Sequence, residues 1–362
     1  MKILHVANFN YKKCGLNFWA VAYKLSNGFV RNGHNVLNFS DRDVARAGNP
    51  LGMRKLGVRW ANARLLDACC NFRPDLVLFG HADTIRPDTL DAIRAMLPEV
   101  RLAQWNVDPL FEPDNVARLL GKAAHVDLTF VTTAGPALLA ATAPGAAPAA
   151  FMPNPVDPGI ESGRAFAVAE PPHDLFYAVG SPRVPRQWDG TNFDVEALVR
   201  RLRAALPELR CDFHGLEGRP VVDGAPYFEA LARSPMALNL SRRNDNYLYA
   251  SDRMAHILGN GALAVTDRAT GFAEIFGEDE MAFYGDTAEM FDRLRFFARA
   301  DGARRRAAEA GWRKAHGLFD GARVARYLLE RIAGAPLSLA YGWPTELWRG
   351  DAAAASATGS QK

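Results

Sequence analysis

The chain has 362 residues, of which 49% are apolar and 23% charged, a composition typical of a globular protein with large buried cores. The 43 Lys and Arg side chains nearly balance the 40 Asp and Glu, so the net charge of +3 provides no general electrostatic footprint for nucleic acid. The four cysteines form neither a CxxC pair nor a disulfide-rich pattern, which favours a reducing cytoplasmic compartment. This length predicts about two domains.

The N-terminal forty residues indicate the fold class. Residues 3–7 are a short apolar run typical of a buried parallel strand, and a polar turn over 8–15 leads into an amphipathic stretch over 17–32. Gly33 ends that helix, and residues 35–40 form the next strand of a βαβ unit. Further strands are predicted at 75–80, 101–106 and 127–132. Strands that alternate with helices predict an α/β fold with a doubly wound parallel sheet.

One uncharged stretch, residues 128–156, is long enough to span a bilayer. It contains five prolines, so a continuous helix is excluded, and we predict a strand, a short helix and a loop instead. The first fourteen residues carry polar and basic side chains where a signal peptide would need an apolar run. We therefore expect a soluble, cytoplasmic protein.

A second series of strands follows a proline-rich connector at 152–159. The strand pattern recurs, with helices between, at 174–180, 209–215, 236–241, 262–267 and 281–285. The sequence thus predicts two tandem Rossmann-like domains. The first domain is predicted to cover 1–155 and the second 156–330. A helical C-terminal segment over 331–350 and a disordered tail over 351–362 follow.

The turn between the first strand and the first helix contains Gly15. Ligands of such sheets bind beyond the carboxyl ends of the strands, near helix N-termini. A dinucleotide fingerprint needs three glycines in G-x-G-x-x-G and this turn has one, which argues against a nicotinamide-dependent dehydrogenase. Gly15 is a candidate for an acceptor or phosphate loop; the alternative is that it only permits the turn.

The sequence Asp41-Arg42-Asp43 matches the D-x-D pattern with which some transferases hold a divalent metal. The pattern is common by chance, and here it follows the second predicted strand. We interpret it as a solvated loop and predict no metal site.

The segment 236–276 is the most informative part of the chain. A strand ends at Ser241, and Ser251 is placed to cap a helix over 252–258. Ser251, Arg253 and the free amides of the first helical turn would present positive potential to a phosphate. His256 lies three residues after Arg253 and so shares its helical face.

A resemblance to a known family begins at these residues. The order of Arg253, a polar residue at 256, a glycine turn, a strand that ends at Asp267, and then Gly271-x-x-Glu274 resembles the donor-binding half of GT-B glycosyltransferases. It is most similar to the bacterial group that includes the CgeB-like proteins. The resemblance implies two Rossmann-like domains that face each other across a cleft, with the acceptor in the N-terminal domain and a nucleotide-sugar in the C-terminal one.

The resemblance extends from about 174 to 330 and is weaker before 150. The connector at 152–158 resembles the family's interdomain linker, and residues 104–109 resemble its Trp-x-x-Asp-Pro stretch. The donor-binding residues that it implies are Gly180, Arg183, Arg186, His214, Ser251, Arg253, His256, Asp267, Gly271 and Glu274. The alternatives are surface arginines at 183 and 186 and a satisfied helix histidine at 256.

The sequence departs from the family at one point. Retaining GT-B enzymes often have two glutamates eight residues apart beside the donor, and Leu248 and His256 stand at those positions here. His256 can still hydrogen-bond a hydroxyl group, but it does not carry a carboxylate's charge. Retention and inversion of the sugar therefore both stay open.

Candidates for the acceptor side lie at strand ends of the first domain: His81 and Asp83 after one strand, and Asp108 after the next. An inverting transferase needs a general base for the acceptor hydroxyl, and a carboxylate or imidazole serves. Asp108 is the first choice because Trp105 and Pro109 flank it as in the resembled group, and His81 is the second. The alternative is that Asp108 is a turn residue before a proline.

We predict a glycosyltransferase that moves a sugar from a nucleotide-sugar to an acceptor hydroxyl in bacterial cell-surface glycan synthesis. The expected partners are a nucleotide-sugar and a glycan or lipid-linked acceptor, and we expect no nucleic acid and no cofactor. We also expect no metal, because arginines and backbone amides would compensate the diphosphate charge in its place. The basic region around Arg304, Arg305 and Arg306 is a candidate for peripheral contact with the inner membrane, although interspersed acids favour a solvated helical face. The competing functions are a nucleotide-sugar epimerase and a non-catalytic nucleotide-sugar-binding protein.

Overall fold

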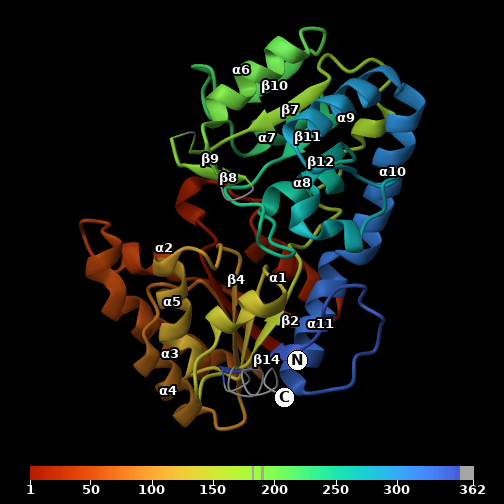
Figure 1. The fold of residues 1–362 in the computed structure, drawn as a ribbon. Coiled ribbons are helices and arrows are strands. Elements are labelled where there is room, and N and C mark those ends of the chain that lie inside the picture. The colour runs from red at the N-terminus through yellow and green to blue at the C-terminus, as the bar shows by residue number, and fades with distance from the viewer. Residues whose placement is uncertain (182, 189–190, 351–362) are drawn as a thin grey trace. The chain divides into compact units, whose positions relative to one another are not determined.

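A computed structural model describes residues 1–181, 183–188 and 191–350 (Figure 1). The described residues form two compact units, one made of residues 1–153 and 321–350 and the other of the described part of 154–320. The C-terminal part of the chain thus returns to the first unit. The tail that we expected to be disordered, 351–362, lies outside the described residues.

The first unit contains a seven-stranded sheet of order β14-β6-β5-β4-β3-β1-β2. All of its neighbours pair in parallel except β14, which is antiparallel to β6. The sheet order reverses between β1 and β3, which marks the point where open α/β sheets bind ligands. The strands are β1 (Lys2–Ala7), β2 (Asn35–Ser40), β3 (Leu76–Gly80), β4 (Arg101–Asn106), β5 (Leu128–Val131), β6 (Ala149–Phe151) and β14 (Leu347–Trp348).

Helices cover this sheet and bury its apolar strands. On one face, Leu65 of α3 and Ile93 of α4 pack with Val77 and Leu102 of the sheet. The helices are α1 (Val21–Arg31), α2 (Asp41–Ala47), α3 (Val58–Phe72), α4 (Pro87–Met96), α5 (Pro113–Ala123) and α11 (Gly321–Ala333), with 3-10 turns η1 (Tyr11–Lys13), η2 (Arg54–Gly57) and η3 (Gly135–Ala141). The predicted helix over 17–32 begins four residues late because the preceding residues form turns.

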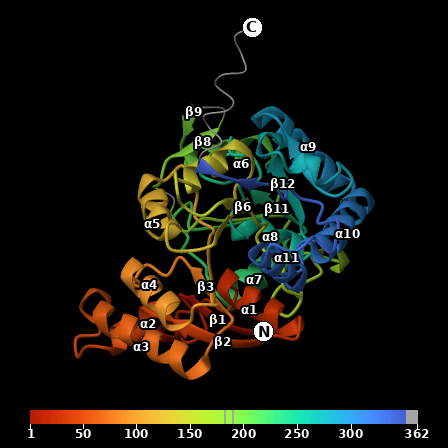
Figure 2. The same cartoon turned by 90° about the horizontal axis from the view of Figure 1, so that it is seen from below.

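The helix α11 corrects our domain boundaries. It belongs to the first unit, whereas the sequence assigned residues up to 330 to the second domain. Helices α1 and α11 lie side by side in Figures 1 and 2, and a Cβ on Gly28 would come within 2.2 Å of the Gly321 carbonyl oxygen. Tyr327 also packs against Phe130 of β5. The segment 331–350, expected to be helical, ends its helix at 333 and then contributes β14.

The second unit contains a five-stranded parallel sheet of order β10-β7-β11-β12-β13. Its order reverses between β7 and β11, which places a second ligand-binding switch point there. A two-stranded hairpin, β8 with β9, follows β7. The strands are β7 (Leu175–Ala178), β8 (Arg186–Trp188), β9 (Thr191–Phe193), β10 (Cys211–His214), β11 (Met236–Asn239), β12 (Leu263–Asp267) and β13 (Ala282–Tyr284).

Helices pack on this second sheet as well, and both units are Rossmann-like α/β domains, as predicted. Val199 of α6 and Leu294 of α9 share one core with Leu238 and Val265 of the sheet. The helices are α6 (Val195–Ala205), α7 (Ala225–Ala232), α8 (Asp252–Gly259), α9 (Thr287–Arg299) and α10 (Asp301–Leu318), with 3-10 turns η4 (Ala165–Ala167), η5 (Arg268–Thr270) and η6 (Phe272–Glu274).

The uncharged stretch 128–156 folds as predicted into a strand, a short 3-10 turn and a loop with a further strand, β6. Within the described ranges, no helix combines the length and the apolar character needed to cross a bilayer.

Candidate functional sites

A hollow of about 230 Å³ opens in the second unit at the carboxyl ends of β7 and β11. We call it the switch-point pocket. Three arginines and three serines line it, and no carboxylate does among the described lining residues, so its chemistry favours an anionic ligand. The lining residues are Gly180, Ser181, Val184, Arg186, Leu240, Ser241, Arg242, Tyr249, Ser251 and Arg253.

Hydrogen bonds fix the guanidinium group of Arg253 at the carboxyl ends of β7 and β11. Its Nη1 donates to the carbonyl oxygen of Leu240 at 2.8 Å, and its Nη2 donates to that of Ala178 at 3.2 Å. The group also lies 5.3 Å from the ring centroid of Tyr177. These contacts join the ends of β11 and β7 without involving a carboxylate. The full positive charge of Arg253 therefore remains available to a ligand.

The second arginine of the pocket, Arg186, is buried. Its Nη1 donates to the carbonyl oxygen of Val184 at 3.1 Å, and its Nε has no hydrogen-bond partner among the described residues. Arg186 also forms no ion pair within that part of the chain. Because a buried cation without a counter-ion is unfavourable, this arginine is suited to an anion that enters the pocket.

Ser251 occupies the N-cap position of α8, as predicted, but its hydroxyl group does not cap the helix. Its Oγ atom is buried and forms no hydrogen bond with any described residue. The expected capping bond is therefore wrong: the side chain lines the switch-point pocket instead of turning to the first helical turn. An unbonded buried hydroxyl beside two arginines can donate to a phosphate oxygen or accept from a sugar hydroxyl.

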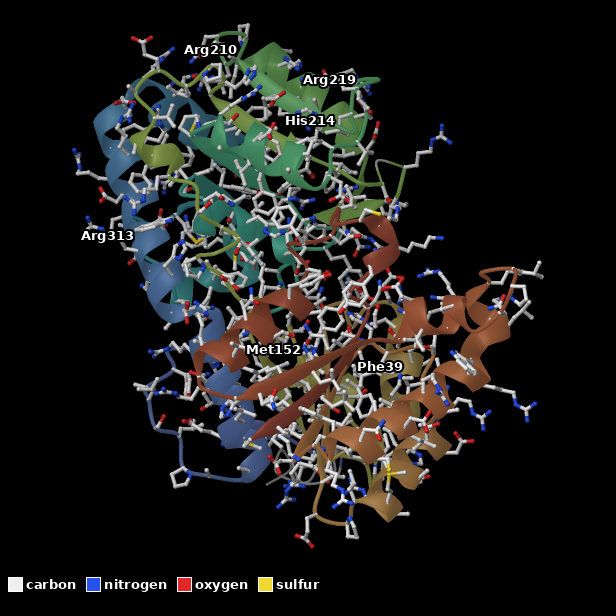
Figure 3. The ribbon with its side chains drawn as sticks, turned by 180° about the vertical axis from the view of Figure 1, so that it is seen from behind. Phe39, Met152, Arg210, His214, Arg219 and Arg313 are labelled. Carbon is white, nitrogen blue, oxygen red and sulfur yellow. The ribbon has the colours of Figure 1, made fainter. Side chains whose placement is uncertain are left out.

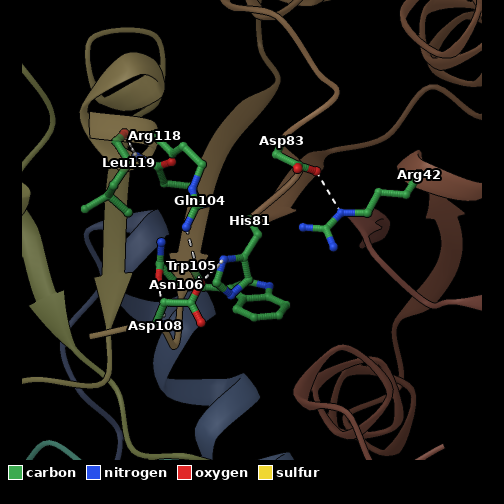
Figure 4. Close-up of a pocket in the computed structure, with 9 residues that line it drawn as sticks. All are labelled: Arg42, His81, Asp83, Gln104, Trp105, Asn106, Asp108, Arg118 and Leu119. Atoms are coloured by element: carbon green, nitrogen blue, oxygen red, sulfur yellow. Dashed lines mark hydrogen bonds and ion pairs between the residues drawn. The ribbon is translucent and has the colours of Figure 1, made fainter. Parts of the chain in front are cut away.

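The first unit has a small pocket of about 40 Å³ at the carboxyl ends of β3 and β4 (Figure 4). This volume holds a group of about the size of a water molecule or a single hydroxyl. The lining residues are Arg42, His81, Asp83, Gln104, Trp105, Asn106, Asp108, Arg118 and Leu119.

His81 and Asp108, the two predicted candidates for the base, meet in this pocket. The His81 Nδ1 atom lies 3.5 Å from Oδ2 of Asp108, and Arg118 Nη2 lies 3.6 Å from the same oxygen (Figure 4). His81 has a φ of +56°, a conformation that is strained for a residue with a side chain. An imidazole oriented by a carboxylate is a common arrangement for proton transfer.

The His81 ring packs on Trp105, whose indole belongs to a buried chain of hydrogen bonds. The His81 ring packs edge-on against Trp105, with 5.6 Å between centroids, and the Trp105 Nε1 atom donates to Nε2 of His5 at 3.0 Å. Complete burial lowers the pKa of His5 to about 3, so the ring is neutral. Because Nε2 accepts from the indole, Nδ1 carries the hydrogen and donates to Ser26 Oγ at 2.8 Å. Gly80 permits this packing, since a Cβ there would lie 2.1 Å from the indole.

The D-x-D sequence is not a solvated loop, contrary to our interpretation, because its residues open α2. Asp41 is buried and accepts from the backbone nitrogen and the hydroxyl of Thr84, while burial raises its pKa. Asp43 accepts from the backbone nitrogen of Tyr11 at 2.7 Å. The two carboxylates thus bind different parts of the chain, Asp41 at Thr84 and Asp43 at Tyr11, and do not converge on one site. No cluster of metal-ligating side chains occurs in the described ranges.

Residues 186–330 match the family model described as "Glycosyl transferase-like". Most of this glycosyltransferase-like region lies in the second unit, and its last ten residues, 321–330, belong to α11 of the first unit. No curated protein matches the chain.

Solved structures match nearly the whole chain. Sucrose-phosphate synthase from Thermosynechococcus elongatus is 10% identical with a TM-score of 0.57, and the match covers 92% of this chain and 99% of that one. Anabaena Alr3699/HepE, solved with UDP and glucose, is 12% identical with a TM-score of 0.54 over 92% and 100%. A UDP-forming trehalose-phosphate synthase from Burkholderia xenovorans is 11% identical with a TM-score of 0.54 over 93% and 99%.

These comparisons confirm the predicted α/β fold with two Rossmann-like domains of the GT-B type and the glycosyltransferase-like family of the C-terminal region. The finer assignment to the CgeB-like group stays a prediction. The matched region 186–330 contains Arg186, Ser251 and Arg253, while Gly180 and Ser181 precede it.

Several residues predicted at the donor site lie outside the switch-point pocket of this glycosyltransferase-like domain. Asp267 caps η5, where its carboxylate accepts from the backbone of Ala269 at 2.9 Å. Gly271, with a φ of +79°, lies under the ring of Tyr247, and Glu274 accepts from the Tyr247 hydroxyl at 2.6 Å. Tyr247 therefore covers the Gly-x-x-Glu segment.

The two predicted donor-site histidines also have protein partners. His256 Nδ1 lies 2.8 Å from Oε1 of buried Glu161, which fits the satisfied helix histidine. His214 Nε2 is buried and lies 3.1 Å from Oδ1 of Asp212, but it forms no hydrogen bond with a described residue; Asp212 also pairs with Arg219 at 3.0 Å. His214 nevertheless ends β10, the strand next to β7.

Two further predicted residues, Arg183 and Gly15, are exposed in loops. Arg183 precedes the hairpin and does not line the switch-point pocket. Gly15, with a φ of +90°, lies in the turns before α1 and does not line the small pocket. The sequence analysis missed Ser181, Ser241, Arg242 and Tyr249, which line the switch-point pocket. Ser181, Ser241 and Arg242 follow the parallel strands β7 and β11 closely, which is the signal that could have found them, whereas Tyr249 lies shortly before α8 and carries no such signal.

Ion pairs occupy part of the basic C-terminal region. Arg304 is buried and donates to the carbonyl oxygen of Phe297, and both Arg304 and Arg305 pair with Asp301. Arg313, which points outward from α10 in Figure 3, pairs with Glu309. Interspersed acids thus pair with these arginines, as the alternative interpretation expected, and membrane contact through this region stays a prediction.

Proposed function

We propose that this protein is a glycosyltransferase that binds the diphosphate of a nucleotide-sugar in the switch-point pocket. The observation that carries the proposal is the convergence of Arg186, Arg253 and the unbonded Ser251 hydroxyl in one pocket without a carboxylate among its described lining residues. Planar guanidinium groups bind phosphate oxygens in two places, and the N-terminus of α8 adds favourable potential. The same cations would stabilise the diphosphate as it leaves the sugar.

The donor is proposed to be a UDP-sugar. The support is the structural similarity to Anabaena Alr3699/HepE, which was solved with UDP and glucose. We propose that Arg186 and Arg253, in place of a metal or other cofactor, compensate the diphosphate charge.

The acceptor hydroxyl is proposed to be deprotonated in the first unit by the pair of His81 and Asp108. The 3.5 Å separation supports a shared role, in which Asp108 orients the imidazole and His81 takes the proton. A glycan or lipid-linked acceptor, used in bacterial cell-surface glycan synthesis by a member of the CgeB-like group, is proposed from the sequence resemblance.

Calorimetric titration of the full chain with UDP, GDP, ADP, their sugar derivatives and NAD tests the proposal. A ligand at 100 times its Kd stabilises the fold by about 2.7 kcal/mol, so thermal unfolding provides a second readout. Selective binding of one nucleoside diphosphate that weakens in Arg253→Ala supports the donor site. Binding of NAD alone, or of none of these ligands, would refute it.

Turnover separates the competing functions. A transferase releases UDP from its UDP-sugar faster when acceptor is present, an epimerase changes the sugar without acceptor, and a binding protein leaves the sugar intact. Activity that persists in a chelator would support the proposal that arginines replace a metal.

A further inference from the structure

The segment between α2 and α3 of the first unit exposes an unusual number of apolar side chains. Leu51, Met53, Leu56 and Trp60 leave 72%, 51%, 58% and 46% of their surfaces exposed, although they lie within ten positions of the chain. Large exposed apolar patches mark interaction sites. We call this region the α2–α3 surface and define it by nine residues: Arg46, Leu51, Met53, Arg54, Lys55, Leu56, Arg59, Trp60 and Arg64.

This exposure is built into the fold, because hydrogen bonds and close packing hold the segment. The Asn49 side chain donates to the carbonyl oxygen of Met53 at 2.8 Å and accepts from its backbone nitrogen at 3.1 Å. It also donates to the carbonyl oxygen of Ala45 on α2 at 3.2 Å. At Gly57, a Cβ would lie 1.6 Å from that same carbonyl oxygen, so η2 lies directly against α2. The apolar side chains therefore project from a fixed backbone.

Positive charge is concentrated in the same segment. Between Asp43 and Asp67 the sequence has five basic side chains and no acidic one, in a chain whose net charge is only +3. Three of these cations pair with acids, namely Arg46 with Asp43, Arg54 with Asp83 and Arg64 with Asp67. Lys55 and Arg59 are exposed and form no ion pair with any described residue, so their charge is available to a ligand. The guanidinium carbon of Arg64 lies 4.6 Å from the ring centroid of Trp60, so this cation and the indole share one face.

We propose that the α2–α3 surface docks the protein on a bilayer that contains anionic lipids. Leucine, methionine and tryptophan side chains enter the boundary between headgroups and acyl chains, while adjacent lysines and arginines bind the anionic headgroups. The charge pattern favours lipid over a protein partner, because protein interfaces deplete lysine at their apolar core. Here Lys55 stands between Met53 and Leu56.

The surface adjoins the small pocket of the first unit. Arg54 of the surface and Arg42 of the pocket bind the two oxygens of Asp83, each at 2.8 Å. A docked first unit therefore holds the pair of His81 and Asp108 near the bilayer. The inference that the acceptor is lipid-linked rests on the proposed function. The docking on a bilayer does not depend on that function.

Co-sedimentation of the full chain with vesicles tests the docking. We expect binding to vesicles of phosphatidylcholine mixed with phosphatidylglycerol, weaker binding to phosphatidylcholine alone, and release by salt. The paired substitutions Leu51→Ser with Leu56→Ser, and Lys55→Glu with Arg59→Glu, should each weaken binding by at least about tenfold. The matched control, Arg299→Glu with Arg306→Glu, makes the same charge change at exposed arginines of the C-terminal basic region and should bind as the wild type does.

Three results would overturn the proposal. The first is no binding to the anionic vesicles, and the second is an equal loss of binding in the control variant. The third is a dimer in analytical ultracentrifugation that the Leu51→Ser, Leu56→Ser variant loses, which would make the surface a contact between copies. UDP binding, measured on the same samples, reports on the switch-point pocket alone, so failure of the docking and failure of the proposed function are distinguishable.

Discussion

The Nδ1 atom of His81 lies 3.5 Å from Oδ2 of Asp108, although the two residues follow different strands of the first unit. The register of the sheet explains the distance, because Gly80 at the end of β3 pairs with Trp105 in β4. Asp108 is held in its turn by its backbone nitrogen, which donates to the Asn106 side chain at 2.7 Å. The parallel topology thus joins two groups that the sequence separates.

Asp108→Asn should slow sugar transfer by about 10²-fold and leave UDP binding unchanged, because the amide cannot stabilise a protonated His81. The measurement is kcat at saturating donor and acceptor, together with a UDP titration. Asp114→Asn, at an exposed aspartate of α5, is the matched control and should behave as the wild type does. Undiminished transfer in Asp108→Asn would remove this carboxylate from the mechanism.

Arg253→Ala should weaken UDP binding by roughly 1.5–3 kcal/mol, the usual value for a hydrogen bond to a charged group. It should also lower the melting temperature of the free protein, because the Leu240 and Ala178 carbonyls lose their donor. Calorimetry and thermal unfolding measure the two effects separately. Arg183→Ala changes an arginine outside the pocket and should alter neither; unchanged UDP affinity in Arg253→Ala would contradict the donor site.

Ser251→Ala separates a helix cap from a ligand contact. Loss of a capping bond costs about 1 kcal/mol of stability, but the Ser251 hydroxyl forms no such bond. We therefore expect an unchanged urea midpoint and a several-fold weaker UDP affinity. The matched control is Asp194→Ala, which removes a capping side chain that accepts from two backbone nitrogens of α6 and should lower the midpoint. Loss of stability with full UDP affinity in Ser251→Ala would reverse the assignment.

The features predicted correctly from the sequence are local. Strands at 101–106 and 262–267, and the N-terminus of the helix after Ser251, depend on apolar runs and turn residues that lie within a few positions of each other. Polar residues after the strands at 75–80, 101–106 and 174–180 identified His81, Asp108 and Arg186 as candidates, because parallel topology places strand ends together. Arg253 was identified from the first turn of the helix after Ser251.

The features that the sequence did not predict depend on distant partners. His256 is bound to Glu161, 95 positions earlier in the chain, and no local pattern indicates that pairing. The place of α11 in the first unit rests on a contact between Gly28 and Gly321, which needs both helices in position. The Ser251 hydroxyl has the sequence context of a cap, and only the surrounding pocket shows that it points elsewhere.

His5→Gln should flatten the acid dependence of stability. The pKa of His5 falls from 6.5 to about 3 on folding because of burial, so the unfolded chain binds one more proton between these values. The free energy of unfolding is therefore highest above pH 6.5 and falls by about 1.4 kcal/mol per pH unit as the pH drops toward 3. Glutamine can accept from Trp105 and donate to Ser26 without titrating. Urea unfolding across this range measures both slopes, and the difference at neutral pH gives the packing cost of the substitution. Equal slopes would show that folded His5 takes up its proton at its ordinary pKa.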